Sequence, residues 1–350
     1  MVVTLGLVGM LLAVPLWAMF IGLGWPPYLR DKAWQTLGAM AVLVVGATCP
    51  PLAILLALAL WHTGEINALR DAGIFPPFVA VATMGAVAFV FMLTVSVPAW
   101  QQDWLRGAIV LAGLSQVGVL GFQLWQLLRM QKPQSFHFWR DSLRGSFGNR
   151  VVTAAFLAFC LPLAPWWLMP AFGLGLLATN SFTALGGAAL GLAVLHPSLV
   201  GYWAPGVALA LVSIIYWRGN PIDSFTERKL IWRLCVEAWW YSPRREFWLG
   251  QGHDAFGRQS RWWAAQNLVK QRYSQAHNDA AQVLLEYGAL GALALAAWLG
   301  GLGFGMRLGD PWTAALLVAL FCSLNQFTLH LPNTGLPVVV VAGVLWSRVL

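Results

Sequence analysis

The sequence predicts an all-α fold, a polytopic bundle of membrane-spanning helices, and three observations support this class. Hydrophobic residues make up 59% of the 350 residues, whereas Asp, Glu, Lys and Arg together make up 10%. An ordinary soluble domain carries about 25% charged residues. The mean hydropathy is +0.67, and the apolar residues fall in long runs. A helix of about 20 apolar residues crosses a bilayer, and backbone groups cannot stay unpaired in lipid, so helices are expected.

Apolar runs separated by short polar breaks predict about ten spans, and up to twelve if prolines divide some runs. The runs are 2–24, 33–61, 75–98, 104–128, 151–170, 171–195, 203–217, 282–306, 311–330 and 334–348. Pro50 and Pro51 interrupt the second run, and Pro162 and Pro170 bracket the end of the fifth, where proline kinks or separates helices. The first run has no basic residue before it and is expected to be a retained span.

The short segment after the fourth run predicts the topology. Its charged residues are Arg129, Lys132, Arg140, Asp141, Arg144 and Arg150. Short loops rich in Lys and Arg favour the cytoplasm. With ten spans, both termini are then cytoplasmic. We therefore expect three parts: N-terminal transmembrane helices over 1–217, a large periplasmic loop over 218–276, and C-terminal transmembrane helices over 277–350.

The large loop holds ten Lys or Arg and five Asp or Glu, out of 34 charged residues in the chain. Gly219–Pro221 is a turn signal, and Ser224 with Glu227 fits a capping box at a helix start. The amphipathic pattern that follows ends before Pro243, and a Trp- and Arg-rich helix of this kind is expected to lie in the membrane interface. Basic residues set between apolar runs exclude a nucleic-acid module.

A histidine and two glycines mark the place where the large loop returns to the membrane. His277 and Asn278 precede an apolar run, and Gly288 and Gly291 follow inside it. Histidine exchanges a proton near neutral pH, and the amide can orient the imidazole ring. The alternative is that His277 and Asn278 cap a helix and that the glycines allow close helix packing.

This arrangement resembles a signature of the O-antigen ligase family, whose relatives include O-antigen polymerases and bacterial protein O-oligosaccharyltransferases. Arg228–Trp232 is similar to the family's arginine and tryptophan at the start of the loop, and Leu249–Phe256 to its Gly-x-Gly-x-x-x-Phe turn. Arg144–Asn149 resembles the Gly-Thr-Phe-x-Asn stretch, with Arg150 in place of the usual Pro-Asn. The resemblance covers about residues 140–345.

The resemblance implies a GT-C-like glycosyltransferase of lipopolysaccharide biosynthesis in the bacterial inner membrane. It would move a glycan from an undecaprenyl diphosphate carrier to an acceptor hydroxyl, on lipid A-core or a similar glycan, at the periplasmic face. Membrane lipid would be a further partner, and nucleic acid would not. The alternatives are an O-antigen or polysaccharide polymerase, a protein O-oligosaccharyltransferase, a lipid-linked glycan transporter or flippase, and an inactive homologue.

Two residues are expected to be catalytic under this resemblance. Arg228 can hold a phosphate through two hydrogen bonds at a helix start, where the helix dipole adds to its charge. His277 would take the proton from the attacking hydroxyl or position the diphosphate. A single displacement inverts the anomeric centre. No metal or cofactor is expected, because the large loop has no cluster of carboxylates.

Six further residues are candidates for substrate binding: Trp232, Arg244, Arg245, Gly252, His253 and Asn278. The two arginines could instead attract anionic lipid, and His253 could be a solvated loop residue. Trp262 and Trp263 could stack on sugar rings, but an interfacial aromatic belt is favoured for them.

Two features depart from the family. Its members carry a second arginine in a Ser-Arg step before the large loop, and Thr179–Phe182 contains no arginine. Ten spans are also fewer than the usual twelve. A turn at Asn180 would divide the sixth run into two short helices and change the side of the basic segment.

Overall fold

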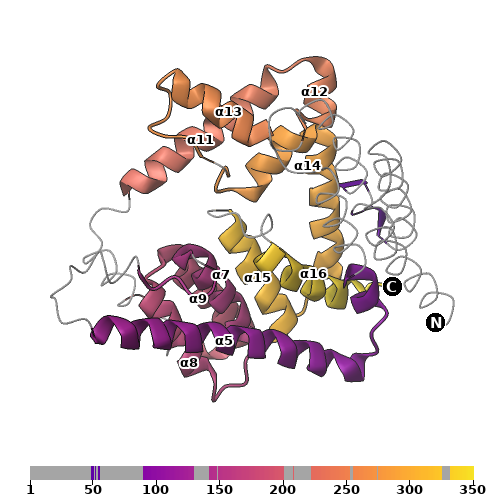
Figure 1. Cartoon of the computed structure of the whole chain (residues 1–350). Helices are drawn as coiled ribbons and strands as arrows, with labels where there is room; N and C mark the ends of the chain where they lie inside the picture. The colour runs from indigo at the N-terminus through magenta and orange to yellow at the C-terminus, as the bar shows by residue number, and fades with distance from the viewer. Residues whose placement is uncertain are drawn as a thin grey trace, which may run out of the picture. The chain divides into compact units, whose positions relative to one another are not determined.

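The computed structural model describes residues 49–50, 52, 54–55, 90–129, 142–147, 149–200, 208, 222–252, 255–273, 275–324 and 332–350. Within these residues every regular element is a helix, which confirms the all-α class (Figure 1). The predicted span over 2–24 and most of the spans over 33–61, 75–98 and 203–217 lie outside them. The chain forms two compact units. The first is Met1–Ser96, Glu227–Gly305 and Trp346–Leu350, and the second is Val97–Thr226 and Met306–Leu345.

Two helices of the described residues are long and apolar enough to cross a membrane. The first is Ala99–Leu128, in which η3 (Ala99–Gln101) runs into α5 (Gln102–Leu128), and the second is α14 (Asp279–Gly305). The other apolar helices have 10–17 residues. The predicted bundle of about ten spans is therefore not confirmed. The run expected over 104–128 is one long helix, and the run over 282–306 lies in α14, which is kinked at Gly288.

The second unit packs short helices against α5. They are α7 (Arg150–Cys160), η4 (Leu161–Leu163), α8 (Met169–Thr179), α9 (Phe182–Leu195), η5 (Pro197–Leu199), α15 (Pro311–Ser323) and most of α16 (Pro332–Trp346). Small residues permit close approach: a Cβ on Gly113 of α5 would lie 2.5 Å from Phe172 of α8, and one on Gly191 of α9 would lie 2.6 Å from Val318 of α15. This unit has no space for larger side chains at these crossings.

Two expected spans of this unit are each divided. The fifth run breaks between Leu163 and Met169, where the prolines separate η4 from α8. The sixth run, expected as a single span over 171–195, is wrong as one helix, because α8 ends at Asn180 and α9 begins at Phe182. Asn180 takes the left-handed conformation (φ 49°) that ends a helix, and it is 8% exposed.

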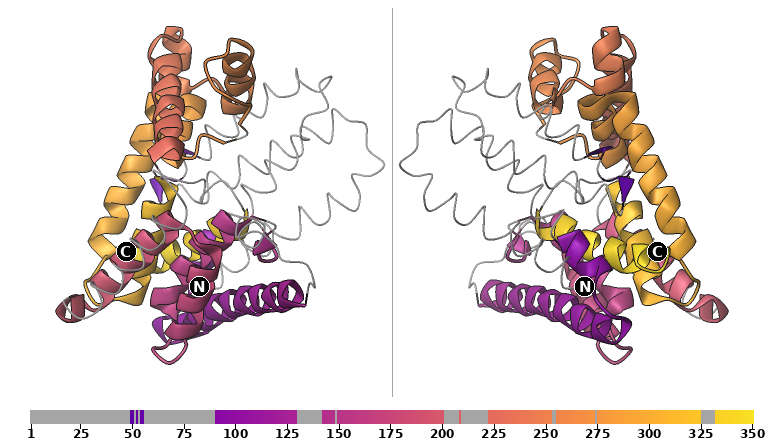
Figure 2. Two further views of the ribbon diagram at one scale, coloured as in Figure 1. Left: turned by 90° about the vertical axis from the view of Figure 1, so that its left-hand side faces the viewer. Right: turned by 90° about the vertical axis from the view of Figure 1, so that its right-hand side faces the viewer.

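The first unit gathers α11 (Ile222–Trp240), α12 (Arg244–Leu249) and α13 (Ala255–Ala265) at one end of α14 (Figure 2). Their shared core consists of Ile231, Cys235, Ala255, Phe256, Trp263, Val269, Ala276 and Leu285. The centre of the apolar stripe on α11 therefore packs inside the large loop, where lipid cannot reach it. α11 begins at Ile222, so Ser224 lies inside the helix and the predicted capping box is wrong. Arg228 is the seventh residue of α11, beyond its first turn, so the predicted position of Arg228 at a helix start is wrong as well.

Candidate functional site

The three stretches of the large loop that carry the family resemblance meet within the first unit. From α11, the Trp232 indole Nε1 donates a hydrogen bond to the Ala276 carbonyl, at 3.0 Å, one residue before His277. From the turn between α12 and α13, the amides of Gln251 and Gly252 donate to the carbonyls of Leu285 and Glu286 in α14, both at 3.0 Å. The structure thus brings together segments that lie up to 44 residues apart in the sequence.

Glycines make the contact between the turn and α14 possible. Gly288 has non-helical angles (φ 66°, ψ −166°) and kinks α14. A Cβ on Gly288 would lie 2.4 Å from the Gly250 nitrogen, and a Cβ on Gly250 (φ 82°) would lie 2.2 Å from the Glu286 carbonyl oxygen. Backbone meets backbone here, so both positions require glycine. Gly250 of the turn and Gly288 of the signature therefore form one structural joint. Phe256, which is fully buried, anchors the same turn in the core.

His277 stands at the entrance to α14 in a left-handed backbone conformation (φ 56°). Such a conformation is uncommon for a residue other than glycine, and it persists only where the surroundings hold it. The peptide before it is held on both sides: the Ala276 amide donates to Gln282 Oε1 at 3.1 Å, and the Ala276 carbonyl accepts from Trp232. The imidazole ring lies edge-on to the Tyr273 ring, with centroids 6.2 Å apart.

Arg228 and His277 are electrostatically coupled. Burial lowers the pKa of His277 from its ordinary 6.5 to about 4, and the positive charge of Arg228 lowers it further in the same direction. His277 is therefore a neutral imidazole at neutral pH, able to accept a hydrogen bond or a proton. Both side chains are half-buried.

The predicted cap of α14 is present at Asn278. Its Oδ1 accepts a hydrogen bond from the Ala281 amide at 2.9 Å, and its carbonyl accepts from Gln282. Gln282 Nε2 in turn donates to Glu286 Oε1 at 3.1 Å. Glu286 and Asp279, which are 1% and 2% exposed, belong to this polar start of the helix.

Three residues of this site were not among the candidates from the sequence. Tyr273 Oη donates a hydrogen bond to Glu227 Oε1 at 2.5 Å, and the Tyr273 amide donates to Ser260 Oγ at 2.7 Å. Burial, and next the hydrogen bond to Glu227, raise the pKa of Tyr273 to about 12. No local pattern could have found this contact, because Glu227 and Tyr273 are 46 residues apart.

The other predicted residues are placed as follows. Arg244 and Arg245 are exposed on α12, next to a ring cluster in which Trp239 stacks on Phe247 at 4.5 Å. Gly252 is buried, and His253 lies outside the described residues. Trp262 is 56% exposed, whereas Trp263 is 2% exposed, so the predicted interfacial position of Trp263 is wrong.

The Arg144–Phe147 stretch forms a turn on α5 in the second unit. Gln123 Oε1 accepts hydrogen bonds from the amides of Arg144 and Gly145, at 3.1 and 3.0 Å. Gln116 Oε1 accepts from the amide and the hydroxyl of Ser146, at 3.0 and 2.9 Å. Thr153 Oγ1 donates to the Arg144 carbonyl at 2.6 Å. Two glutamines of one helix thus hold this turn.

Among the described residues, no group of three or more His, Cys, Asp or Glu could hold a metal ion. No family model matches the chain, and no curated protein matches it. The resemblance to the O-antigen ligase family therefore stays a prediction that rests on the residues quoted above.

Proposed function

We propose that this protein is an O-antigen ligase-like glycosyltransferase of the bacterial inner membrane. It would transfer a glycan from an undecaprenyl diphosphate carrier to a hydroxyl of lipid A-core or a similar acceptor, at the periplasmic face. The observation that carries the proposal is the hydrogen bond from Trp232, four residues after Arg228, to the carbonyl of Ala276. It joins the two stretches that contain Arg228 and His277, and the charge of Arg228 acts on the imidazole. His277 lies two residues before α14, a helix that is long and apolar enough to cross a membrane.

The membrane setting is supported by the exposure of the two long helices. In the most apolar window of Ala99–Leu128, 28% of the residues are buried, and in that of Asp279–Gly305, 33%. A core helix of a soluble protein would bury most of such a window. Leu293 and Phe304 of α14 are 61% and 85% exposed, which suits contact with lipid tails. We propose a multi-pass arrangement, with the first unit's site on the periplasmic side.

The chemistry of the proposed transfer uses both residues. The acceptor oxygen forms a bond to the anomeric carbon while the bond from that carbon to the diphosphate oxygen breaks. His277 takes the proton of the acceptor hydroxyl, and the electron pair of the broken bond leaves with the diphosphate. Arg228 stabilises the negative charge that develops there. A single displacement of this kind inverts the anomeric configuration and needs no metal in the step.

The test is reconstitution of the purified protein in proteoliposomes with a polyprenyl-diphosphate-linked glycan and candidate acceptors. We expect transfer by the wild type, and at least about a hundredfold loss of rate in His277→Ala and in Arg228→Ala at normal abundance. Arg261→Ala, a half-buried arginine of α13, is the matched control and should keep its activity. Full activity in both site variants would reject the assignment.

The acceptor separates the related functions. Transfer to lipid A-core indicates a ligase, transfer to a second carrier-linked glycan a polymerase, and transfer to a peptide hydroxyl a protein O-oligosaccharyltransferase. An inactive homologue would leave all three acceptors unmodified.

One observation favours a transporter or flippase as the second candidate. α8 and α9 are 11 and 14 residues long and meet at Asn180 in an otherwise apolar stretch. Many secondary transporters bind substrate where helices of this broken kind meet. Movement of a fluorescent carrier lipid between leaflets of the same proteoliposomes, without glycan transfer, would support this candidate and overturn the first.

A further inference from the structure

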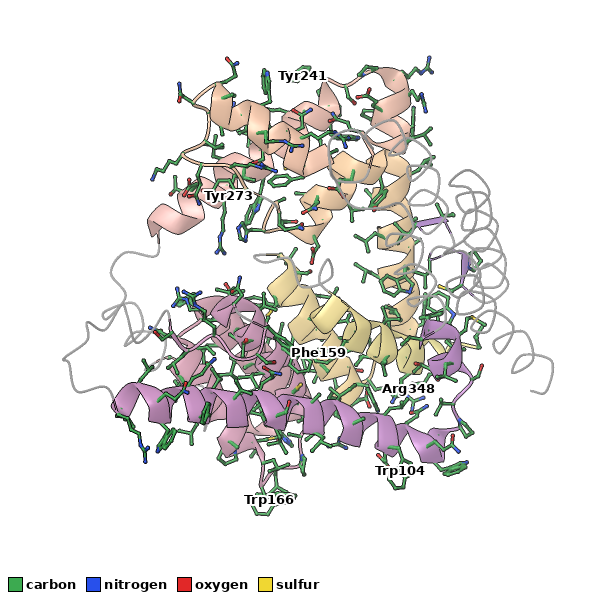
Figure 3. All side chains as sticks on the ribbon, viewed as in Figure 1. Trp104, Phe159, Trp166, Tyr241, Tyr273 and Arg348 are labelled. Atoms are coloured by element: carbon green, nitrogen blue, oxygen red, sulfur yellow. The ribbon has the colours of Figure 1, made fainter. Side chains whose placement is uncertain are left out.

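We propose that Tyr273 and Glu227 form a positioning pair, which holds His277 and Arg228 in the arrangement that glycosyl transfer requires. This inference rests on the proposed function, because the same reaction measures it. Neither residue belongs to the stretches from which the candidate site was predicted, although Glu227 directly precedes Arg228. Figure 3 labels Tyr273, which follows α13 and precedes α14 in the chain and lies beside α11.

Tyr273 is fixed from three directions. Its hydroxyl donates to Glu227 of α11 at 2.5 Å, and its amide donates to Ser260 of α13 at 2.7 Å. Ser260 is fully buried, so the connection cannot shift without disturbing the core of the large loop. The third contact is the edge-on packing of the Tyr273 ring against the imidazole of His277 (6.2 Å, 80°). Tyr273 therefore links α11 and α13 to the candidate base.

The first consequence concerns the imidazole. The backbone of His277 is in a sparsely populated conformation, and hydrogen bonds from both sides hold the preceding peptide of Ala276. These contacts fix the position of the His277 backbone and so of its Cβ. The Tyr273 ring then restricts the orientation of the imidazole plane. A base must point a nitrogen at the acceptor hydroxyl within hydrogen-bond reach, so this restriction acts on the chemical step.

The second consequence concerns the charge beside Arg228. Glu227 precedes Arg228 on α11, and a mobile carboxylate there would compete with a phosphate for the guanidinium and repel an anionic donor. The hydrogen bond from Tyr273 holds the carboxylate in one place. Because the pKa of Tyr273 is raised to about 12, its hydroxyl stays protonated and continues to donate throughout the neutral range.

Neither member of the pair is assigned a contact with the reacting atoms. Their removal should therefore slow the transfer step more than it weakens donor binding. In Tyr273→Phe, which keeps the ring and loses the hydroxyl, we expect kcat to fall about tenfold, the effect of losing one hydrogen bond to a charged group. The KM for the lipid-linked donor should rise by a smaller factor than kcat falls, because the released carboxylate of Glu227 competes with the phosphate for Arg228.

The experiment is a double-mutant cycle in proteoliposomes with Tyr273→Phe, Glu227→Ala and the double variant. Because one hydrogen bond joins the two residues, the double variant should be no slower than the slower single variant. Glu227→Gln retains an oxygen that accepts from Tyr273 and should recover part of the loss of Glu227→Ala. The control is Tyr241→Phe, at the other end of α11, whose side chain is 81% exposed. It should match the wild type.

Several results would overturn the pair. They are wild-type kcat in Tyr273→Phe, losses that multiply in the double variant, and a raised KM with unchanged kcat. Should Tyr273→Phe fold poorly, the comparison of Glu227→Ala with Glu227→Gln decides. Equal kcat in these two variants would then overturn the pair. A wild type that transfers glycan, together with an inactive His277→Ala and a fully active Tyr273→Phe, rejects only the pair. A wild type that transfers nothing to any acceptor rejects the proposed function and the pair together.

Discussion

Two turns of the molecule each pack against a long helix, and different hydrogen bonds hold them there. The turn over Gly250–Gly252 rests on the kink of α14, and the turn over Arg144–Phe147 rests on α5. Each contains a glycine with positive φ, Gly250 (82°) and Gly145 (65°). The first is held by backbone amides that donate to helix carbonyls, whereas the second is held by the side-chain oxygens of two glutamines.

The difference lies in what each joint can tolerate. At α14 the backbones approach so closely that no Cβ fits on Gly250 or Gly288. At α5 the side chains of Gln116 and Gln123 bind the turn, and a Cβ on Gly145 would lie 2.6 Å from Thr153 Oγ1. Both joints therefore require glycine, and the second also depends on two glutamine side chains. The first joint also fixes the first turns of α14, which follow His277. The pKa of His277 is in turn affected by the charge of Arg228.

The largest expected effect comes from breaking the joint at α14. In Gly288→Ala, a methyl group would lie 2.4 Å from the Gly250 nitrogen, at a backbone conformation that alanine disfavours. We expect the large loop to lose about 3 kcal/mol or more of stability, and glycan transfer to fall with it. Pulse proteolysis in detergent measures the opening of the loop.

Gly303→Ala is the control for this prediction, because it lies on the same helix with nothing within 4 Å of the added Cβ. Alanine there should be neutral or slightly stabilising, since it favours the helix. Equal protease resistance of the two variants would show that the joint does not hold the loop.

The second expected effect sharpens the comparison at α5. Gln116→Leu keeps the volume but removes the oxygen that accepts from the amide and hydroxyl of Ser146. Gln116 is 6% exposed, so water replaces the lost bonds poorly, and we expect a loss of about 2 kcal/mol. Denaturant unfolding in detergent measures it. Gln126→Leu, exposed on the same helix, should change little, and a similar loss there would contradict the role of Gln116.

The smallest expected effect is the pH dependence of the contribution that His277, which lies near the first joint, makes to stability. His277 has a pKa of about 4 when folded, against an ordinary 6.5, so the unfolded chain binds the proton more readily. Its contribution to stability is complete above about pH 6.5 and is lost as the pH falls toward about 4. Because the side chain is only half-buried, we discount the loss between about pH 7 and about pH 5 to about 1 kcal/mol.

Comparison of the wild type with His277→Gln isolates this contribution, since the other titrating groups are common to both. The variant should lose about 1 kcal/mol less than the wild type over that range. An identical pH dependence in both proteins would mean that His277 keeps its ordinary pKa in the fold.

The sequence predicts the long helices well and the contacts between them poorly. Apolar length was sufficient to predict α5 and α14, because a long run of apolar residues has few alternatives to a helix. Apolar length alone failed at Asn180, where α8 and α9 separate at a left-handed residue. The alternative of a turn at Asn180, which came from the polar residues there, is confirmed. The stripe on α11 was found, but periodicity cannot say whether Ile231 faces lipid or, as observed, the core of the loop.

The site shows the same limit. His277, Arg228 and the glycines came from a pattern along the chain, and the structure places these stretches in one unit. The contact of Gly250 with Gly288 joins residues 38 positions apart, and that of Glu227 with Tyr273 joins residues 46 positions apart. Such contacts follow from the path of the chain in three dimensions, which spacing along the sequence does not encode.

The kink of α14 also has a mechanical meaning. Because Gln251 and Gly252 donate hydrogen bonds to carbonyls just before Gly288, the turn stabilises the kinked conformation of α14. Bending the helix further at this point would strain two hydrogen bonds outside the helix as well as its own ladder. The apolar part of α14 after Gly288 and the polar first turns before it are therefore expected to move as one rigid body. A side chain at the start of α14 would then keep its position relative to the rest of the helix.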